Sequence, residues 1–495
     1  MRTIFFHDSY DKKQSSRPNA VLSVDMNNNR FATGSIANPI KIWEVRSTEN
    51  ATEVDFIAEL DPVEDANRNV NIVRWSPDGN FLATGCASGA ILVWRKSSDI
   101  SPSQSEDEIQ PKEQWTIHKR LNGHSLDVLD LAWSPPMYNL NASKQSNNKE
   151  NMQPSSTAPV TSLLASASFD SKILIWDPLS KSEKKFIIEP IMEIKGDHKK
   201  AVQGVTWDPL GHFIATQSCD RTVRVYQINQ ELFTFFPPAP TSTPVKKGKK
   251  VKPTSELCSS VEVIRSCSIQ EDEDKKVMLY KDEQAALFSR RLCFSTDGSI
   301  LVTVTGQLPE RLAPQCNQKE EQCLDTAYLF SRNQWKKPFC CLPGHNEPIV
   351  AVRFSPVLYQ TQDGQGYGQV YCVLSKKSVV IYNTRITHPI SIMKDCFSET
   401  ISDATWSADG NHLIVSSWDG YCCIVTFDEG ELGLKLSLNG DAKVIHKIMD
   451  QRAKGVQEMG VVEENVQKQP VTNVVAVRRR VHHHNNPPNA VVTVE

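Results

Sequence analysis

A short pattern of strand, turn and strand recurs seven times along this chain of 495 residues. In the most regular copy Trp75 ends a strand, Gly79 lies in the turn four positions later, and Trp94 ends another strand fifteen positions after that. The same intervals return in three further copies, which end at Trp43, Tyr226 and Val425. Such a repeat constrains the fold more than any single residue can, because each copy buries its apolar faces against its neighbours.

The copy from Val70 to Trp94 shows what one repeat is physically. Val70–Trp75 and Phe81–Thr84 are predicted strands, and Ser76–Gly79 is a turn in which Pro presets φ and Gly accepts a positive φ. A second turn leads into Ile91–Trp94, whose apolar side chains are consecutive instead of alternating, which is typical of a strand covered on both faces. A small sheet covered on both faces by copies of itself predicts a propeller blade.

The third copy adds a polar pattern to this frame. Its members are a histidine near the start, a serine of the second strand, an aspartate at the following turn and a tryptophan at the end: His124, Ser166 or Ser168, Asp170 and Trp176. We expect the carboxylate to accept from the imidazole and from backbone N–H groups, while the indole N–H donates inward. Such a network fixes the blade only if every buried polar group has a partner.

The fourth copy keeps part of this pattern, with His198 and Asp220, but ends at Tyr226. The Gly-His start, the Ser-rich second strand and the Trp-Asp end of the third copy resemble the WD repeat. This resemblance implies that the polar residues of the third and fourth copies are structural. The first, second, fifth and sixth copies lack Asp at the corresponding turn, so we expect them to depend on apolar packing.

Together the copies predict one all-β domain, a seven-bladed WD-repeat β-propeller over residues 1–435. Seven blades of about 40–45 residues fill about 300 positions. Thr3–Phe6 is expected to be the outer strand of the last blade, which would close the ring and remove its free edges. We expect flexible inserts at about residues 137–160 and 237–285, and a disordered tail over residues 436–495, which has few aromatic residues.

The bulk properties exclude several classes of protein. A net charge of −3 does not favour direct, sequence-specific DNA binding. The 13 cysteines form no Cys-x-x-Cys pair, and we interpret them as reduced thiols of an intracellular protein. No stretch approaches the roughly 18 consecutive apolar residues of a membrane span, so no membrane is expected as a partner.

The sequence offers no set of residues for catalysis. It contains no Gly-x-Ser-x-Gly elbow, phosphate-binding loop or His-Glu-x-x-His motif, so we predict neither an enzyme nor a cofactor. His482–His484 lacks an accompanying carboxylate or Cys, so no metal site is predicted. Most tryptophans fall at strand positions and belong to the core, but Trp418 is placed to be an anchor at an interface.

A basic run lies inside the second insert and consists of Lys246, Lys247, Lys249, Lys250 and Lys252. One interpretation is a nuclear-import signal or a patch for acidic partners. The other is a solvated basic linker. From the residues alone both interpretations stay open.

Four segments go beyond the generic repeat: Glu113–Trp133, Val202–Tyr226, Leu287–Gly306 and Ile401–Gly433. Together they closely resemble the family of WD-propeller subunits of chromatin assembly factor 1, the middle-sized of its three subunits. The resemblance implies a non-enzymatic histone chaperone subunit in the nucleus, which helps to deposit histones H3 and H4 onto DNA during replication and repair. The implied partners are the large and small subunits of that factor, the anti-silencing-function histone chaperone and the histones, directly or through the complex.

The same family uses a short basic and apolar motif in its tail to bind the delivering chaperone. The resemblance therefore makes Arg478, Arg479, Arg480 and Val481 a candidate docking motif. The residues that follow, His482–Asn485, depart from the family pattern because the expected apolar residues and Pro are missing.

Two other functions remain as alternatives. The related histone-regulator propeller acts in replication-independent deposition and is expected to continue into a second large folded domain, whereas few residues follow Gly433 here. The other alternative is a WD-repeat scaffold or substrate receptor of a different nuclear complex, which would bind a ligase adaptor.

Overall fold

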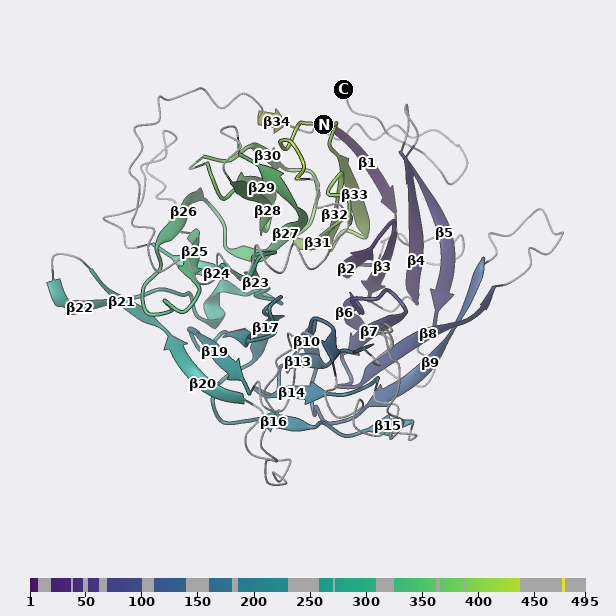
Figure 1. Ribbon diagram of the computed structural model, residues 1–495, viewed down its shortest axis with the longest axis horizontal. Coiled ribbons are helices and arrows are strands. Elements are labelled where there is room, and N and C mark those ends of the chain that lie inside the picture. The colour runs from purple at the N-terminus through teal and green to yellow at the C-terminus, as the bar shows by residue number, and fades with distance from the viewer. Residues whose placement is uncertain are drawn as a thin grey trace, which may run out of the picture.

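The computed structural model describes residues 1–7, 19–36, 39–47, 52–61, 69–99, 111–138, 160–179, 186–229, 258–269, 272–308, 325–361, 366–386, 388–436 and 474–476. Within these ranges seven sheets of four or five strands follow one another around a ring, and two further sheets have two strands each (Figure 1). The predicted seven-bladed propeller is therefore confirmed.

Each of the first three blades has four strands in chain order, from the inner strand beside the ring centre to the outer one. Blade one consists of β2 (Val21–Asn27), β3 (Arg30–Ser35), β4 (Ile40–Ser47) and β5 (Thr52–Leu60). Blade two consists of β6 (Val70–Trp75), β7 (Phe81–Cys86), β8 (Ile91–Asp99) and β9 (Glu113–Leu121), which β15 (Ile187–Ile188) extends in parallel. Blade three consists of β10 (Val128–Trp133), β13 (Leu164–Ser168), β14 (Ile173–Trp176) and β16 (Met192–Ile194).

The next three blades repeat this order. Blade four consists of β17 (Val202–Trp207), β18 (Phe213–Ser218), β19 (Thr222–Ile228) and β20 (Cys258–Ile264). Blade five consists of β23 (Cys293–Phe294), β24 (Ile300–Gln307), β25 (Asp325–Ser331) and β26 (Cys340–His345). Blade six consists of β27 (Ile349–Gln360), β28 (Tyr367–Ser375), β29 (Ser378–Asn383) and β30 (Ser391–Lys394), which β34 (Val474–Ala476) extends in parallel.

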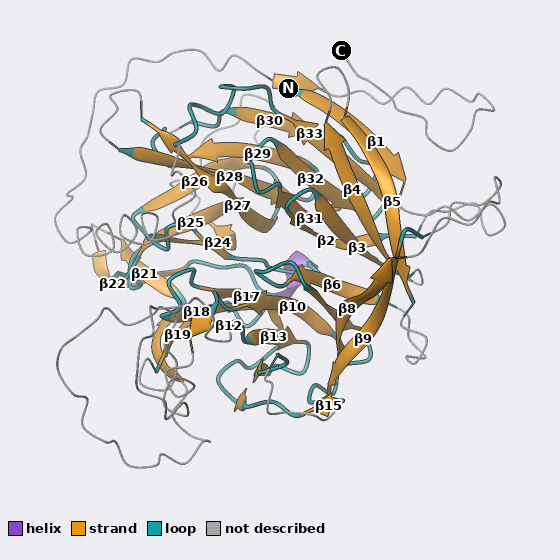
Figure 2. Ribbon diagram, turned by 45° about the vertical axis from the view of Figure 1, so that its right-hand side comes forward, coloured by secondary structure: helices purple, strands orange, loops and turns teal. Residues whose placement is uncertain are grey.

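Blade seven joins the two ends of the propeller. Its strands are β31 (Ile401–Trp406), β32 (His412–Ser417), β33 (Tyr421–Thr426) and, from the start of the chain, β1 (Arg2–His7). β1 runs antiparallel to β33, with Thr3 opposite Val425 and Phe6 opposite Cys422. Both ribbon views show the two strands side by side (Figures 1 and 2). The ring is thus closed by a pairing between residues more than 400 positions apart in the sequence.

The core consists of apolar layers between neighbouring sheets. One such layer joins blades two and three through Ile72, Leu131 and Trp176, which are at most 1 % exposed. At the closing blade, Phe6 packs against Trp43 of blade one with ring centres 5.5 Å apart. Because each sheet is covered on both faces, its strands have the consecutive apolar residues that the sequence showed.

Six inner strands share a bulge near their start. The ladder with the second strand shifts register between Val21 and Ser23, and the equivalent shift falls at Val70/Ile72, Val128/Asp130, Val202/Gly204, Ile349/Ala351 and Ile401/Asp403. A bulge bends its strand and turns the following side chain. At Ser23, Asp130 and Asp403 the residue after the bulge is polar and buried.

Three segments differ from the expectation of flexible inserts and a disordered tail. Residues 258–264 form β20, the outer strand of blade four, and Ser266–Ile269 (β21) pairs with Asp272–Met278 (β22), so the expected insert over 237–285 was wrong for its second half. The reason is that the β-branched residues Val261, Val263 and Ile264 suit a strand, which the Lys- and Pro-rich residues before them obscured.

The other two differences are short. β11 (Met137–Tyr138) pairs with β12 (Val160–Thr161), so the two ends of the expected insert at 137–160 meet as strands. β34 pairs with β30 inside the expected disordered tail. The helical element that the structure describes is a single 3₁₀ turn, Glu283–Ala285 (η2), and no helix in the described ranges has the length and hydropathy of a membrane span.

Candidate functional site

Buried charges fill the centre of the ring. Six inner strands or their leading residues supply three arginines and three aspartates: Arg74, Arg291, Arg353, Asp25, Asp130 and Asp403. We call this set the central charge cluster. The arginines neutralise the buried carboxylates of Asp130 and Asp403, as a protein interior requires. Burial raises the pKa of Asp25, whose carboxylate accepts from the Trp75 N–H at 2.7 Å.

Asp403 is the hub of the central charge cluster. One of its oxygens accepts hydrogen bonds from Ser23 Oγ and Arg74 Nη1, both at 3.0 Å, and lies 3.3 Å from Arg291 Nη1. The other accepts from Arg353 Nη2 at 2.8 Å. Burial alone would raise the pKa of Asp403, but the guanidinium groups of Arg291, Arg353 and Arg74 hold it well below its usual range. The carboxylate therefore stays charged and connects blades one, two, five, six and seven.

Asp130, which pairs with Arg74, extends these contacts to the remaining blades, three and four, and Arg291 adds bonds to blades two and seven. Asp130 Oδ2 accepts from the backbone N–H of Val205 in blade four at 3.0 Å. Arg291, whose side chain is fully buried, donates to Ser402 O at 2.8 Å and to Asn71 O at 3.3 Å. Burial lowers the pKa of Arg291 to about 10 despite the nearby carboxylates. These groups are engaged in joining blades, which gives them a structural role at the ring centre.

The structure brings the predicted residues of blade three together. His124 Nδ1 lies 3.1 Å from Asp170 Oδ2, and its Nε2 lies 2.7 Å from Ser166 Oγ. The indole N–H of Trp176 donates to the same Ser166 Oγ at 2.9 Å. Of the two serines that the sequence left open, Ser166 is therefore the one between the imidazole and the indole, while Ser168 Oγ accepts from the Asp170 N–H at 3.1 Å.

The Asp170 carboxylate also accepts from the backbone N–H groups of Ser125 and Lys172, each at 3.0 Å. Burial opposes ionisation of Asp170, yet the hydrogen bond and charge of His124 lower its pKa to about 2. The carboxylate thus ties the loop before β10 to the turn between β13 and β14.

Blade four has a variant of the same network. His198 Nδ1 lies 3.1 Å from Asp220 Oδ2, and Thr216 Oγ1 lies 2.9 Å from His198 Nε2, in the position that Ser166 has in blade three. Tyr226, which replaces the tryptophan, donates instead to Asp197 Oδ2 at 3.0 Å. The sequence did not indicate that Thr216 and Asp197 complete this network.

The two basic motifs predicted from the sequence lie outside the described residues. These are the candidate import signal at Lys246, Lys247, Lys249, Lys250 and Lys252, and the candidate docking motif at Arg478, Arg479, Arg480 and Val481. β34 ends two residues before Arg478. Both motifs stay predictions.

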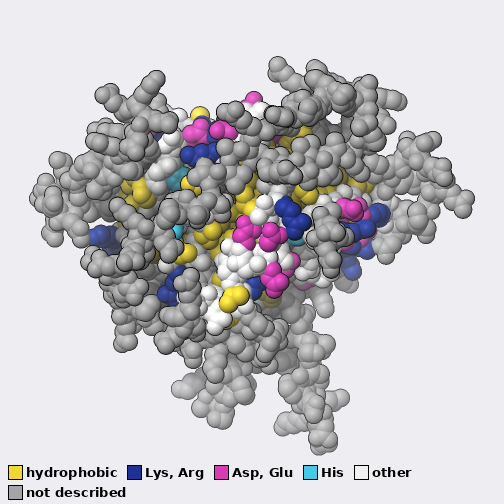
Figure 3. All heavy atoms as spheres, turned by 90° about the horizontal axis from the view of Figure 1, so that it is seen from above, with side chains coloured by type: hydrophobic (Ala, Val, Ile, Leu, Met, Phe, Trp, Pro, Cys, Tyr) yellow, Lys and Arg dark blue, Asp and Glu magenta, His cyan; other side chains and the backbone are white. Residues whose placement is uncertain are grey.

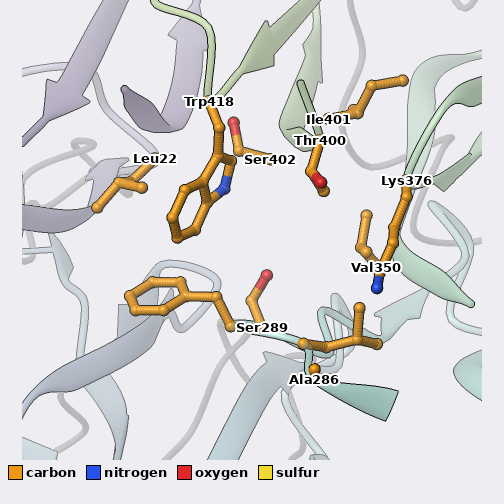
Figure 4. A pocket seen from close by; sticks show the side chains of 11 residues that line it. Leu22, Ala286, Ser289, Val350, Lys376, Thr400, Ile401, Ser402 and Trp418 are labelled. Carbon is orange, nitrogen blue, oxygen red and sulfur yellow. The ribbon is translucent and has the colours of Figure 1, made fainter. Parts of the chain in front are cut away.

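A pocket of about 180 Å³ opens beside the ring centre, on one face of the propeller (Figure 4). Its walls come from the loop before β23, from the inner strands of blades one, six and seven, and from two turns. Trp418 and Phe288 form one side, with ring centres 5.8 Å apart in an edge-to-face arrangement. Lys376 stands on the other side and is the charged residue among those that line the pocket. The pocket thus combines aromatic walls with one positive charge.

The edge of the ring differs from this pocket in its mixture of charges. Figure 3 views the side near the N-terminal strand and shows acidic and basic side chains interspersed on its described part. Here the amino group of Met1 lies 3.1 Å from Glu431, and Arg2 donates to Asp428 at 2.9 Å. In the described ranges no group of three or more His, Cys, Asp or Glu residues could hold a metal ion.

The sequence analysis did not predict the central charge cluster or one further buried ion pair between two blades. Arg332 donates to both oxygens of Asp208, at 2.9 and 2.7 Å, and so joins blades four and five through buried charges. Each charged residue stands alone in its own repeat, so no local motif marks it. The sequence did contain a signal for these residues: several otherwise apolar inner strands carry a polar residue at the same position. This shared position becomes visible only when the repeats are aligned with one another.

Comparison with known proteins finds similarity to chromatin proteins. A family model described as the CAF1B/HIR1 beta-propeller domain matches residues 14–150 and 147–432. A mouse protein named as a subunit of chromatin assembly factor 1 is 32% identical over 429 residues, which cover 82% of this chain and 63% of the mouse protein. The chain thus spans just under two thirds of the length of that relative.

Two fungal relatives extend the comparison. The corresponding chromatin assembly factor 1 subunit of baker's yeast is 24% identical over 530 residues, which cover 97% of each protein. Protein HIR1 from Chaetomium globosum is 26% identical over 451 residues, which cover 88% of this chain and 35% of the fungal protein. Identity is therefore higher to the mouse assembly-factor subunit than to this HIR1 protein.

Proposed function

Because the chain belongs to the CAF1B/HIR1 β-propeller family, we propose that it is the non-enzymatic propeller subunit of a chromatin assembly factor 1 complex. In this function it is a histone chaperone subunit and a scaffold for the deposition of histones H3 and H4 onto DNA during replication and repair. The observation that carries the proposal is the 32% identity to the mouse assembly-factor subunit over 82% of the chain.

The structure supports a scaffold in two ways. The ring centre is occupied by charges that bond to one another, Asp403 with Arg74 and Arg353 among them, so the two faces and the edge are left for binding. A closed propeller is rigid and presents loops on both faces, which lets several partners bind at once without overlapping. Both features suit a subunit that joins other proteins.

The proposed partners are the large and small subunits of chromatin assembly factor 1, the anti-silencing-function histone chaperone and histones H3 and H4. The proposed location is the nucleus, which the chromatin-related names of the relatives support. Arg478–Val481 is proposed to be the segment that binds the delivering chaperone, as an extended strand against an edge of its sheet.

The decisive experiment is affinity purification of the tagged full chain from nuclear extract, followed by identification of stoichiometric partners. We expect the large and small assembly-factor subunits. Recovery of a ubiquitin-ligase adaptor in their place would contradict the proposal.

A second candidate function follows from the HIR1 relatives, since the matching family model covers both kinds of propeller. In this case the protein would serve replication-independent deposition. The same purification separates the two functions, because subunits of a histone-regulator complex would then replace the assembly-factor subunits.

The basic run of the second insert is proposed to be a nuclear-import signal. Changing Lys246, Lys247, Lys249 and Lys250 to Ala should lower the nuclear fraction of a fluorescent fusion protein, because import receptors bind clusters of positive charge. A matched control changes the exposed Lys195, Lys199 and Lys200 of the propeller surface. An unchanged nuclear fraction in the first variant would mean that the run is a solvated linker.

A further inference from the structure

Several apolar side chains are exposed on one face of the propeller. In an antiparallel blade the loop before the inner strand and the turn between the second and third strands lie at the same end. Leu126 is in such a loop, and Phe169 and Trp418 are in such turns, with exposed fractions of 47%, 57% and 36%. This end of the blades, which we call the upper face, thus carries apolar surface of the kind found at protein interfaces.

The pocket beside Trp418 is held in a fixed shape. Arg290, which is 1% exposed, donates to the backbone oxygens of Lys281 and Asp282. Gln203 Nε2 donates to Leu287 O at 2.5 Å. These bonds fix both ends of the loop that carries the aromatic wall, so the pocket exists before any ligand arrives. A preformed pocket binds with little loss of conformational entropy.

The charge at the pocket is not balanced by a direct ion pair. Lys376 Nζ lies 3.5 Å from the carbonyl oxygen of Ala285, and among the described residues no carboxylate oxygen lies within 4.0 Å of it. The carboxylate of Asp325 pairs directly with Lys281, at 2.6 Å, and interacts with Lys376 only at longer range. The neighbouring Lys377 donates to a backbone oxygen at 2.6 Å and is not part of the lining. A carboxylate placed at the pocket would therefore gain a charge-assisted hydrogen bond.

We propose that this upper-face pocket binds an extended segment of a partner protein in which a large apolar side chain is flanked by carboxylates. The apolar side chain packs against the wall formed by Trp418 and Phe288, and a carboxylate pairs with Lys376. Charge complementarity selects this ligand over two basic ones, a histone tail and the chain's own Arg478–Arg480, because like charges at Lys376 are unfavourable. The inference rests on the proposed scaffold function, since it names the chemistry of one docking site on it.

The test uses two labelled peptides and the purified full chain. The acidic probe is Asp-Asp-Leu-Phe-Asp-Asp, and the basic counterpart has Lys at every Asp position, so that only the flanking charge differs. We expect saturable binding of the acidic probe in fluorescence anisotropy and binding of the basic one that is at least about tenfold weaker. Trp418→Ala and Lys376→Glu should each weaken binding of the acidic probe by about tenfold or more.

Matched controls separate the pocket from the rest of the surface. Lys377→Glu makes the same charge change one residue away, and Ile386→Ala removes an exposed apolar side chain, 41% exposed, from the opposite end of blade six. Both should bind the acidic probe as the unchanged protein does. Thermal melting of each variant checks that it remains folded.

Three results would overturn the inference. They are equal binding of the two probes, an unchanged affinity of Lys376→Glu for the acidic probe, and no saturable binding up to about 1 mM. If deletion of residues 437–495 raises the affinity, the occupant is the chain's own tail, which also contradicts the proposal. Failure of the proposed function can be told apart from failure of this inference. If the proposed function is wrong, the assembly-factor subunits do not copurify with the unchanged protein.

Discussion

The centre of the ring and the outer part of blade three are both held by buried charges, but the charges join different parts of the molecule. At the centre, Asp403 contacts residues of four other blades. In blade three, Asp170 and His124 join a loop and a turn of the same blade. A central charge is therefore shared by the whole ring, whereas an outer charge serves a single sheet.

This difference predicts how much of the propeller a substitution destabilises. Removing a shared charge leaves several buried partners unpaired at once, and each of them lost its hydration when the ring closed. Removing a local charge exposes a loop that can take up water. Substitutions at the centre should lower the stability of the entire propeller, and substitutions at the outer positions should loosen one blade.

The largest effect is expected at the hub. Asp403→Ala leaves Arg74, Arg291 and Arg353 with excess buried positive charge, and we expect the free energy of unfolding to fall by about 3–5 kcal/mol. Urea denaturation followed by tryptophan fluorescence measures this loss. The matched control is Asp428→Ala, which removes a carboxylate whose side chain is 57% exposed at the edge of the ring, and it should leave the free energy of unfolding almost unchanged. Equal effects of the two substitutions would contradict a shared central role.

A smaller loss is expected at the outer closure of the ring. Deleting Met1–Phe6 removes the pairing with β33 and the contacts of Phe5 with Phe397, at 5.8 Å, and of Phe6 with Trp43. Because these side chains are only partly buried, we expect a loss of about 2–4 kcal/mol. Hydrogen exchange should accelerate in β33 first and least in blade three. Uniform acceleration in all blades would mean that this strand, like Asp403, supports the whole ring.

Asp170→Ala tests the local network of blade three. The substitution removes the acceptor for His124, Ser125 N–H and Lys172 N–H, and we expect a loss of about 1–3 kcal/mol. Since the pKa of Asp170 is lowered to about 2 in the folded protein, its contribution is present above the unfolded value near 4 and is lost as the pH falls toward 2. Unchanged melting at pH 7, measured by calorimetry, would contradict the network.

The sequence predicted this outer network and the ring because both depend on repeated positions. The spacing from Trp75 to Trp94 sets strand lengths and turns, and His124 and Asp170 fall where a WD repeat has them. The central charge cluster was not predicted, because its contacts join residues such as Ser23 and Asp403, which are 380 positions apart. Only the bulge and the ring closure bring such residues together.

β20 shows a second limit of sequence reasoning. The segment 258–264 ends in β-branched residues that suit a strand, but the long basic and Pro-rich stretch before it breaks the repeat spacing. Its register is fixed by pairing with β19, with Ile264 opposite Val223. Long-range pairing of this kind overrides the local composition that suggested a flexible insert.

Blade six extends the comparison with blade three, because it has a histidine at the position of His124 but no aspartate at the position of Asp170. His345 is buried, and its Nε2 lies 3.3 Å from the hydroxyl of Tyr382, which occupies the position of Trp176. Burial, helped by the charge of Lys394, lowers the pKa of His345 to about 4. The unfolded chain therefore binds a proton between about pH 6.5 and 4 that the folded protein does not, so this residue makes stability fall as the pH falls through that window.

We expect this effect to be the smallest of the four, about 1–2 kcal/mol between pH 7 and pH 4.5, because local opening of the loop relieves part of the cost of burying the charge. His345→Gln keeps a polar group near Tyr382 but does not titrate, so the variant should lose less stability over this range than the unchanged protein. The exposed His388→Gln is the control and should leave the pH dependence as it is. Urea denaturation at the two pH values measures the difference, and identical pH dependence in all three proteins would show that blade six tolerates a charged His345.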